Sequence, residues 1–164
     1  MAGAELDGLV LFRQESMFYL TGYDTSGYSM FQAMYLGLDG KLTLLTRTAD
    51  RIQSRETSIV EDIQIWIDEE NASPGLELRR ILEAHGCANK QIGIEYHAYG
   101  LTGQRALMVN EALKGLCRLT DASDLVRLVR LVKSDLELQY VRKSGRICGQ
   151  VLETSITHTQ PGTR

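Results

Sequence analysis

Between residues 8 and 120, short apolar runs separated by polar turns follow one another, a pattern typical of strands in a sheet. Residues 8–12 (GLVLF) are apolar throughout, as expected for a strand buried on both faces. Asp39-Gly40 is a hairpin signal, so the strands on either side of it should pair antiparallel. Residues 62–67 (DIQIWI) alternate strictly, which places their isoleucines on one half-buried face and Trp66 on the other, over a second layer or at a subunit contact. The predicted strands are residues 8–12, 29–37, 41–46, 62–67, 92–96 and 116–120.

Helices are predicted between these strands. The clearest begins at Pro74 after the N-cap residue Ser73, carries an apolar stripe and ends before Gly86. The other helical segments are residues 14–21, which end at Gly22, residues 48–58 and residues 101–114. Alternation of helices and strands indicates an α/β domain, and the early hairpin makes its sheet mixed. We therefore expect a three-layer α/β/α fold with a mixed sheet of about six strands.

The pattern changes after residue 124. Residues 125–131 are apolar and basic, and Ser134 then caps a polar helix that should run to about residue 159 and stop at Pro161-Gly162. Its apolar positions recur at close to the helical period, at Leu136, Tyr140, Ile147 and Val151. We expect this stripe to remain incompletely covered within the chain. The predicted division is residues 1–131 for the α/β domain and residues 132–164 for the first helix of a second domain.

Composition and charge exclude several classes of function. The chain has 164 residues and a net charge of −3, so it lacks the global positive field that would hold a nucleic acid. Its apolar runs are too short to cross a bilayer, and residues 1–8 have neither the basic nor the apolar region of a signal peptide. Three cysteines without a CxxC pair fit a reducing compartment. We expect a cytoplasmic protein with neither nucleic-acid nor membrane partners.

Few residues in the sequence form a pattern that indicates catalysis. Glu95 and His97 share a strand face and would make half of a metal site, but no third ligand is expected nearby. His85 beside Gly86 is expected to have a structural role at a helix end. The arginines at positions 47, 51 and 55 would form a basic ridge on one helix, either a solvated face or a contact for an anion or a subunit. No catalytic or metal residue is therefore assigned, and no cofactor is expected in this chain.

Five motifs, in order along nearly the whole chain, resemble one known family. They are LDGLVL at residues 6–11, MFYLTG at 17–22, KLTLLTR at 41–47, LVRLVKSDLEL at 128–138 and QPGT at 160–163. The chain is thereby identified as similar to the amino-terminal domain of the creatinase, prolidase and aminopeptidase P family, the pita-bread hydrolases. Residues 19–32 (YLTGYDTSGYSMFQ) resemble ectoine hydrolases and Xaa-Pro dipeptidase-type members most closely.

This resemblance implies a ribonuclease H-like motif in the fold and a hydrolase as the parent protein. In the family a carboxy-terminal domain carries the active site, with a divalent metal pair in the peptidases and metal-free chemistry in creatinase. We expect that domain to follow this chain, and the parent to cleave a C–N bond of an Xaa-Pro peptide, creatine or ectoine. The chain alone should be inactive, and its expected partners are a second copy in a homodimer and its own carboxy-terminal domain.

The resemblance also indicates where this domain meets substrate. In creatinase-like relatives, the loop after the MFYLTG motif reaches across the dimer to a partner's active site. The corresponding residues here are Tyr23, Asp24, Tyr28 and Met30, which offer two aromatic rings, a carboxylate and a thioether. Creatinase has a cationic residue where Met30 stands, so this loop is not expected to recognise a carboxylate.

Two functions remain open from the sequence. One is a non-catalytic amino-terminal domain that supports oligomerisation and shapes a neighbouring subunit's substrate pocket. The other is a free-standing α/β module that binds a small ligand or a protein. The loop at residues 23–28 is likewise either part of a substrate pocket or a plain surface loop whose tyrosines cover the sheet edge.

Overall fold

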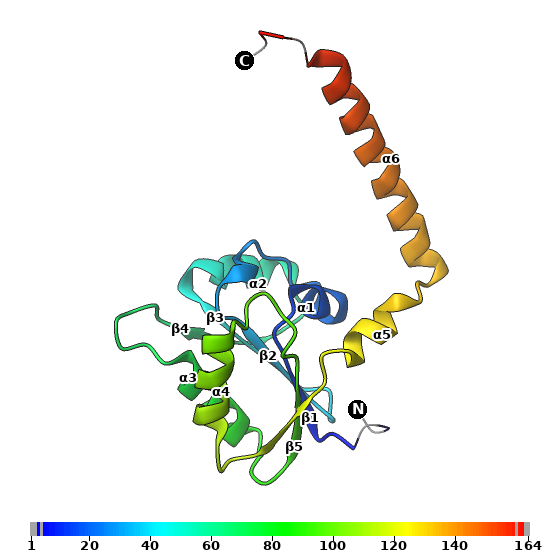
Figure 1. Cartoon of the computed structure of the whole chain (residues 1–164). Helices are drawn as coiled ribbons and strands as arrows, with labels where there is room; N and C mark the ends of the chain where they lie inside the picture. Colours follow the sequence, from blue (N-terminus) through cyan, green and yellow to red (C-terminus); the bar gives the residue numbers. More distant parts are fainter. Residues whose placement is uncertain (1–2, 4, 160, 163–164) are drawn as a thin grey trace. The chain divides into compact units, whose positions relative to one another are not determined.

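The computed structural model describes residues 3, 5–159 and 161–162. Its strands and helices alternate as expected for an α/β fold (Figure 1). The strands are β1 (Gly8–Leu11), β2 (Ala33–Gly37), β3 (Leu42–Arg47), β4 (Asp62–Trp66), β5 (Gln91–Ile94) and β6 (Arg118–Asp121). The helices are α1 (Gln14–Thr21), α2 (Arg51–Thr57), α3 (Pro74–Ala84), α4 (Gly103–Leu113), α5 (Leu125–Leu131) and α6 (Asp135–His158), with short 3-10 turns η2 (Gly27–Ser29) and η3 (Thr48–Asp50).

The six strands form one mixed sheet in the order β4-β3-β2-β1-β5-β6. β1 pairs antiparallel with β2 and parallel with β5, and β2 pairs antiparallel with β3. β3 pairs parallel with β4, and β5 with β6. Among these six strands only β2 therefore runs against the others, and its antiparallel pairing with β3 confirms the hairpin predicted at Asp39-Gly40.

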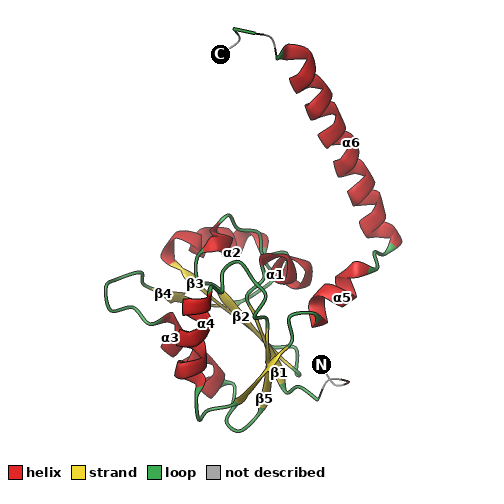
Figure 2. Ribbon diagram, in the orientation of Figure 1, coloured by secondary structure: helices red, strands yellow, loops and turns green. Residues whose placement is uncertain are grey.

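Helices cover both faces of this sheet (Figure 2). Residues at alternate positions of β1 pack on opposite sides, with Val10 in the core under α3 and α4 and Leu9 in the core shared with α1. The α3–α4 side includes Leu82 and Val109, whereas the α1 side includes Met17. The sheet is thus the middle of three layers, and the predicted fold class is confirmed.

Two strand predictions differ from the structure. β2 begins at Ala33 instead of residue 29, because residues 27–29 turn as η2 and the loop crosses the sheet edge before the strand starts. In β4, Trp66 is buried in the core, where its indole N–H donates to the carbonyl oxygen of Phe31 at 3.1 Å. Trp66 therefore covers the core within this chain, and Ile67, predicted on the half-buried face, is exposed beyond the strand end.

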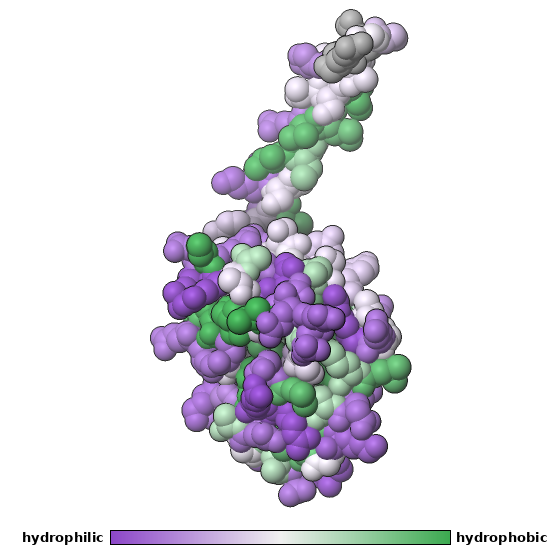
Figure 3. Space-filling view, turned by 90° about the vertical axis from the view of Figure 1, so that its left-hand side faces the viewer, coloured by the Kyte–Doolittle hydropathy of each residue, from purple (hydrophilic) through white to green (hydrophobic). Residues whose placement is uncertain are grey.

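The chain divides into two compact units, residues 1–127 and residues 128–164. The second contains α6, which begins with a capping box between Ser134 and Glu137. The predicted stripe side chains on α6 are all exposed, and Figure 3 shows hydrophobic residues gathered along part of this helix. None of the described helices combines the length and the apolar character that a membrane crossing requires.

Candidate functional site

The predicted loop lies at the sheet edge where β1 and β5 end. Both strands are parallel, so their carboxyl ends meet there, and antiparallel β2 begins at the same edge. Residues 22–32 connect α1 to β2 across this edge. Ligand sites of α/β sheets commonly lie at such carboxyl ends.

Tyr23 anchors the beginning of this loop in the core. Its side chain is fully buried, and its hydroxyl lies 3.2 Å from Gln32 Oε1, to which it donates, and 3.3 Å from Thr46 Oγ1. Burial raises the pKa of Tyr23 above its ordinary value. The expectation that Tyr23 offers its ring at the surface therefore needs correction, because sheet residues surround the ring and use the hydroxyl.

A second set of buried polar groups holds the middle of the loop. Thr25 donates its hydroxyl to Asp50 Oδ1 at 3.0 Å and accepts the backbone N–H of Gly27 at 2.9 Å. Asp50 also pairs with Arg47 at 3.4 Å. A Cβ on Gly27 would come within 2.6 Å of the Asp50 carboxylate, so the loop needs glycine here. Arg47 thus lies at the end of strand β3 and takes part in this network. It does not share a helix with Arg51 and Arg55, which lie on α2, so the predicted basic ridge of three arginines does not form.

Arg105 joins the loop to the segment that follows β5. From the first turn of α4, its Nη1 donates to the carbonyl oxygens of Ser29 at 2.7 Å and Gly100 at 2.9 Å. A Cβ on Gly100 would lie 2.9 Å from the carbonyl oxygen of Tyr28, which shows how closely the two backbones approach. Arg105 and Gly100 fix this contact, and no pattern in the sequence identified either residue.

Of the remaining predicted residues, two are exposed and one is half-buried. Asp24 is exposed, and its backbone N–H donates to Thr57 Oγ1 at 3.1 Å. Met30 is half-buried, and Tyr28 is 51% exposed. The structure therefore presents Asp24 and Tyr28 on a loop whose base is anchored in the sheet.

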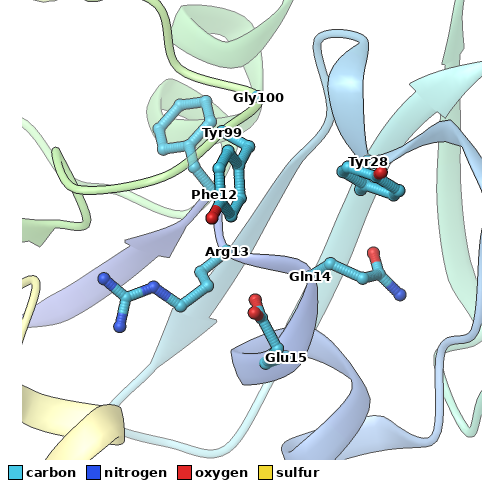
Figure 4. Close-up of a pocket in the computed structure, with 7 residues that line it drawn as sticks. All are labelled: Phe12, Arg13, Gln14, Glu15, Tyr28, Tyr99 and Gly100. Carbon is cyan, nitrogen blue, oxygen red and sulfur yellow. The ribbon is translucent and has the colours of Figure 1, made fainter.

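Tyr28 also lines a pocket of about 510 Å³, here named the Tyr28–Tyr99 pocket. The β1–α1 turn forms its floor, and the segment after β5 forms a wall (Figure 4). Asp24 and Met30 do not line it. The lining residues are Phe12, Arg13, Gln14, Glu15, Tyr28, Tyr99 and Gly100.

Comparison with known proteins places this arrangement in a family. Residues 1–132 match the Creatinase/Prolidase N-terminal domain. The chain belongs to this family. The ectoine hydrolase of Halomonas elongata is 26% identical over 169 residues, which cover 99% of this chain and 42% of that protein. This creatinase/prolidase N-terminal domain spans 42–43% of the length of the curated relatives that it matches.

Solved structures show the same fold. A dipeptidase from Pyrococcus horikoshii superposes with a TM-score of 0.73 at 21% identity, over 99% of this chain and 43% of that chain. The N-terminal domain of a cytoplasmic peptidase from Mycobacterium tuberculosis superposes with a TM-score of 0.60 at 22% identity, over 77% of this chain and 89% of that chain. The N-terminal domain of that peptidase has thus been solved as a separate structure.

Glu95 has a structural position in this domain. Its side chain is fully buried, and Oε2 accepts the backbone N–H groups of Phe12 at 3.1 Å and Arg13 at 2.9 Å. Oε1 accepts the hydroxyl of Ser16 at 2.6 Å. Burial raises the pKa of Glu95, although these hydrogen bonds act in the opposite direction. Glu95 therefore fixes the β1–α1 turn, and its oxygens are already occupied.

The other residues considered in the sequence do not assemble into a reactive group. His85 Nε2 lies 2.8 Å from Thr43 Oγ1, and its ring packs against Tyr35 with centroids 4.6 Å apart. Burial raises the pKa of the Cys117 thiol, which disfavours the thiolate. Within residues 3, 5–159 and 161–162, no three His, Cys, Asp or Glu side chains come together as a metal site.

Proposed function

We propose that this chain is the non-catalytic amino-terminal domain of a pita-bread hydrolase of the Xaa-Pro peptidase, creatinase or ectoine hydrolase type. In this proposal it supports assembly of a homodimer, and its loop at residues 23–30 shapes the substrate pocket of the neighbouring subunit. The catalytic domain, with a divalent metal pair in a peptidase-type parent, would belong to the remainder of the longer protein. The substrate would be a dipeptide or a small molecule.

The loop geometry is the observation that carries this proposal. Buried side-chain hydrogen bonds from Tyr23 and Thr25 and a surface hydrogen bond from Arg105 to the backbone of Ser29 hold the loop, while Asp24 and Tyr28 stay exposed. A surface loop that only connects two elements does not need this number of buried polar partners. A loop that must present side chains to another subunit does, because a rigid support keeps them in position.

The purified chain is expected to hydrolyse neither an Xaa-Pro dipeptide nor ectoine. Hydrolases of the metal-dependent type need a cluster of ligands, and the described residues do not form one. Product release measured by chromatography, with and without added Mn²⁺, tests this directly. Turnover that is proportional to the concentration of this chain would overturn the proposal.

In the longer protein, Tyr28→Ala and Asp24→Ala are each expected to lower kcat/KM by about tenfold, which corresponds to about 1.4 kcal/mol of transition-state binding. The physical reason is that both side chains are exposed on a fixed loop, so their loss removes substrate contacts without disturbing the core.

Ser26→Ala in the same loop is the matched control, because Ser26 is exposed and its side chain forms no cap hydrogen bond to η2. This control should keep the kinetics of the unaltered protein. Sedimentation velocity should show the same dimer for all variants. Unchanged kinetics in both test variants, with dimers intact, would exclude the loop from the substrate pocket.

A further inference from the structure

We propose that the Tyr28–Tyr99 pocket is a binding site for a protonated amine. This inference goes beyond the proposed function, because the pocket is built entirely from residues of the first unit and needs neither a second subunit nor a catalytic domain. Its volume of about 510 Å³ lies within the range of small-molecule sites.

Two tyrosine rings form the aromatic part of the pocket. Tyr28 is 51% exposed and Tyr99 is 81% exposed, although both are large side chains that usually pack. Their ring centroids are 6.4 Å apart and their planes cross at 71°. An organic cation within about 6 Å of such a ring is attracted by the negative charge on its face. Two rings of different orientation can therefore contact one ammonium group and its alkyl carbons.

Glu15 supplies the negative charge. It lies in the first turn of α1, and its side chain is exposed. In Figure 4 the carboxylate points up from the helix toward the space between the aromatic rings. Among the described residues Glu15 takes part in no ion pair and accepts no side-chain hydrogen bond. The pocket therefore contains a carboxylate whose charge is not balanced by a direct partner.

The polar groups beside Glu15 also favour a donor as the ligand. Gln14 donates its Nε2 to the carbonyl oxygen of Tyr23 at 2.7 Å, which leaves Oε1 buried in the pocket wall without a partner among the described residues. The Arg13 Nε and Nη2 both donate to the carbonyl oxygen of His97, which holds the guanidinium against the segment that follows β5. Figure 4 shows this guanidinium directed away from Tyr28. The accessible groups are thus the Glu15 carboxylate and the two aromatic faces, which match a primary ammonium better than an anion.

The test uses the whole chain and propylammonium as the probe, titrated at pH 7 and followed by two-dimensional NMR. Resonances of Glu15, Tyr28 and Tyr99 should shift together. The neutral isostere 1-propanol and the anion propionate should bind at least about threefold more weakly. Raising the salt concentration should weaken binding of the amine, because the carboxylate is exposed.

Two variants separate the parts of the site. Glu15→Gln removes the charge with little change in shape and is expected to weaken propylammonium binding by about threefold to fivefold. Tyr99→Ala removes one aromatic face and should weaken it by a similar factor. The control is Glu56→Gln, which changes an exposed glutamate on α2 that does not line the pocket, and it should leave binding unchanged.

The proposal is overturned if 1-propanol binds as tightly as propylammonium, if Glu15→Gln binds the amine like the unaltered chain, or if the shifted resonances lie outside the pocket. These outcomes would leave the proposed function intact, because that function is tested by the kinetics of Asp24 and Tyr28 variants and by dimerisation. Conversely, unchanged kinetics in those variants would not alter amine binding by this chain.

Discussion

Replacing Glu95 by alanine is expected to lower the free energy of unfolding by about 3 kcal/mol or more. The carboxylate is fully buried and accepts three hydrogen bonds, from the backbone N–H groups of Phe12 and Arg13 and from the hydroxyl of Ser16. Its removal leaves two buried donors and one partly buried donor without a partner, at about 1–3 kcal/mol for each buried donor before relaxation or entry of water. Urea unfolding followed by circular dichroism measures this loss.

The matched control is Glu61→Ala, since Glu61 is exposed and the change should remain within about 0.5 kcal/mol. Ser16→Ala removes only one of the three donors together with its bond, so its effect should lie between the two. If the Glu95→Ala protein is as stable as the Glu61→Ala protein, the Glu95 carboxylate does not hold the β1–α1 turn.

The same group gives a pH dependence whose sign is fixed. Because burial raises the pKa of Glu95 in the folded chain, folding favours its protonated form. Its contribution to stability is therefore largest below the unfolded pKa of about 4.5 and is lost as the pH rises through the folded value. We expect the stability of the unaltered chain relative to Glu95→Gln to fall as the pH is raised from about 4.5. If the difference in unfolding free energy between the two proteins stays constant as the pH is raised from about 4.5, burial does not raise the pKa of Glu95.

Gly22→Ala is expected to destabilise the chain by about 2–4 kcal/mol. Gly22 ends α1 with a φ of 79°, a left-handed conformation that costs an L-residue about 1–2 kcal/mol. In addition, a Cβ at this position would lie 2.8 Å from the carbonyl oxygen of Thr57, which is backbone and cannot simply rotate away. The substitution must therefore also separate α1 from the end of α2.

Gly40→Ala isolates the conformational cost, so that the difference from Gly22→Ala gives the effect of Thr57. Gly40 has the same φ of 79°, but no atom lies within 4 Å of a Cβ built there. The Gly40→Ala substitution should therefore lower the free energy of unfolding only by the conformational cost of about 1–2 kcal/mol. Thermal or urea unfolding of both variants gives the difference, and equal losses would show that the approach of Thr57 does not restrict position 22.

The local pattern of the sequence was sufficient for the order of the six strands and of five helices, but it did not predict α5 at Leu125–Leu131. Gly22 ends α1, Asp39-Gly40 turns the β2–β3 hairpin, and the helix beginning at Pro74 ends before Gly86. Each of these features depends on the conformational preferences of a few neighbouring residues, so short segments carry the information. The apolar run of β1 likewise predicted its burial on both faces, because a central strand has no polar side.

The functional site depends on contacts between distant residues. The sequence placed Tyr23 and Tyr28 together as surface aromatics, yet only the tertiary structure separates them, because Gln32 and Thr46 bury the hydroxyl of Tyr23 while Tyr28 lies over an open pocket. Glu95 is 79 residues from Ser16, so no local pattern could show that its carboxylate caps that turn. Propensity and periodicity act over a few residues and determine the elements, whereas the partners of a polar side chain are determined by which elements pack together. For this chain the sequence alone therefore determined the α/β architecture, and the packing of β1, β5 and the loop before β2 decided which side chains are free to bind.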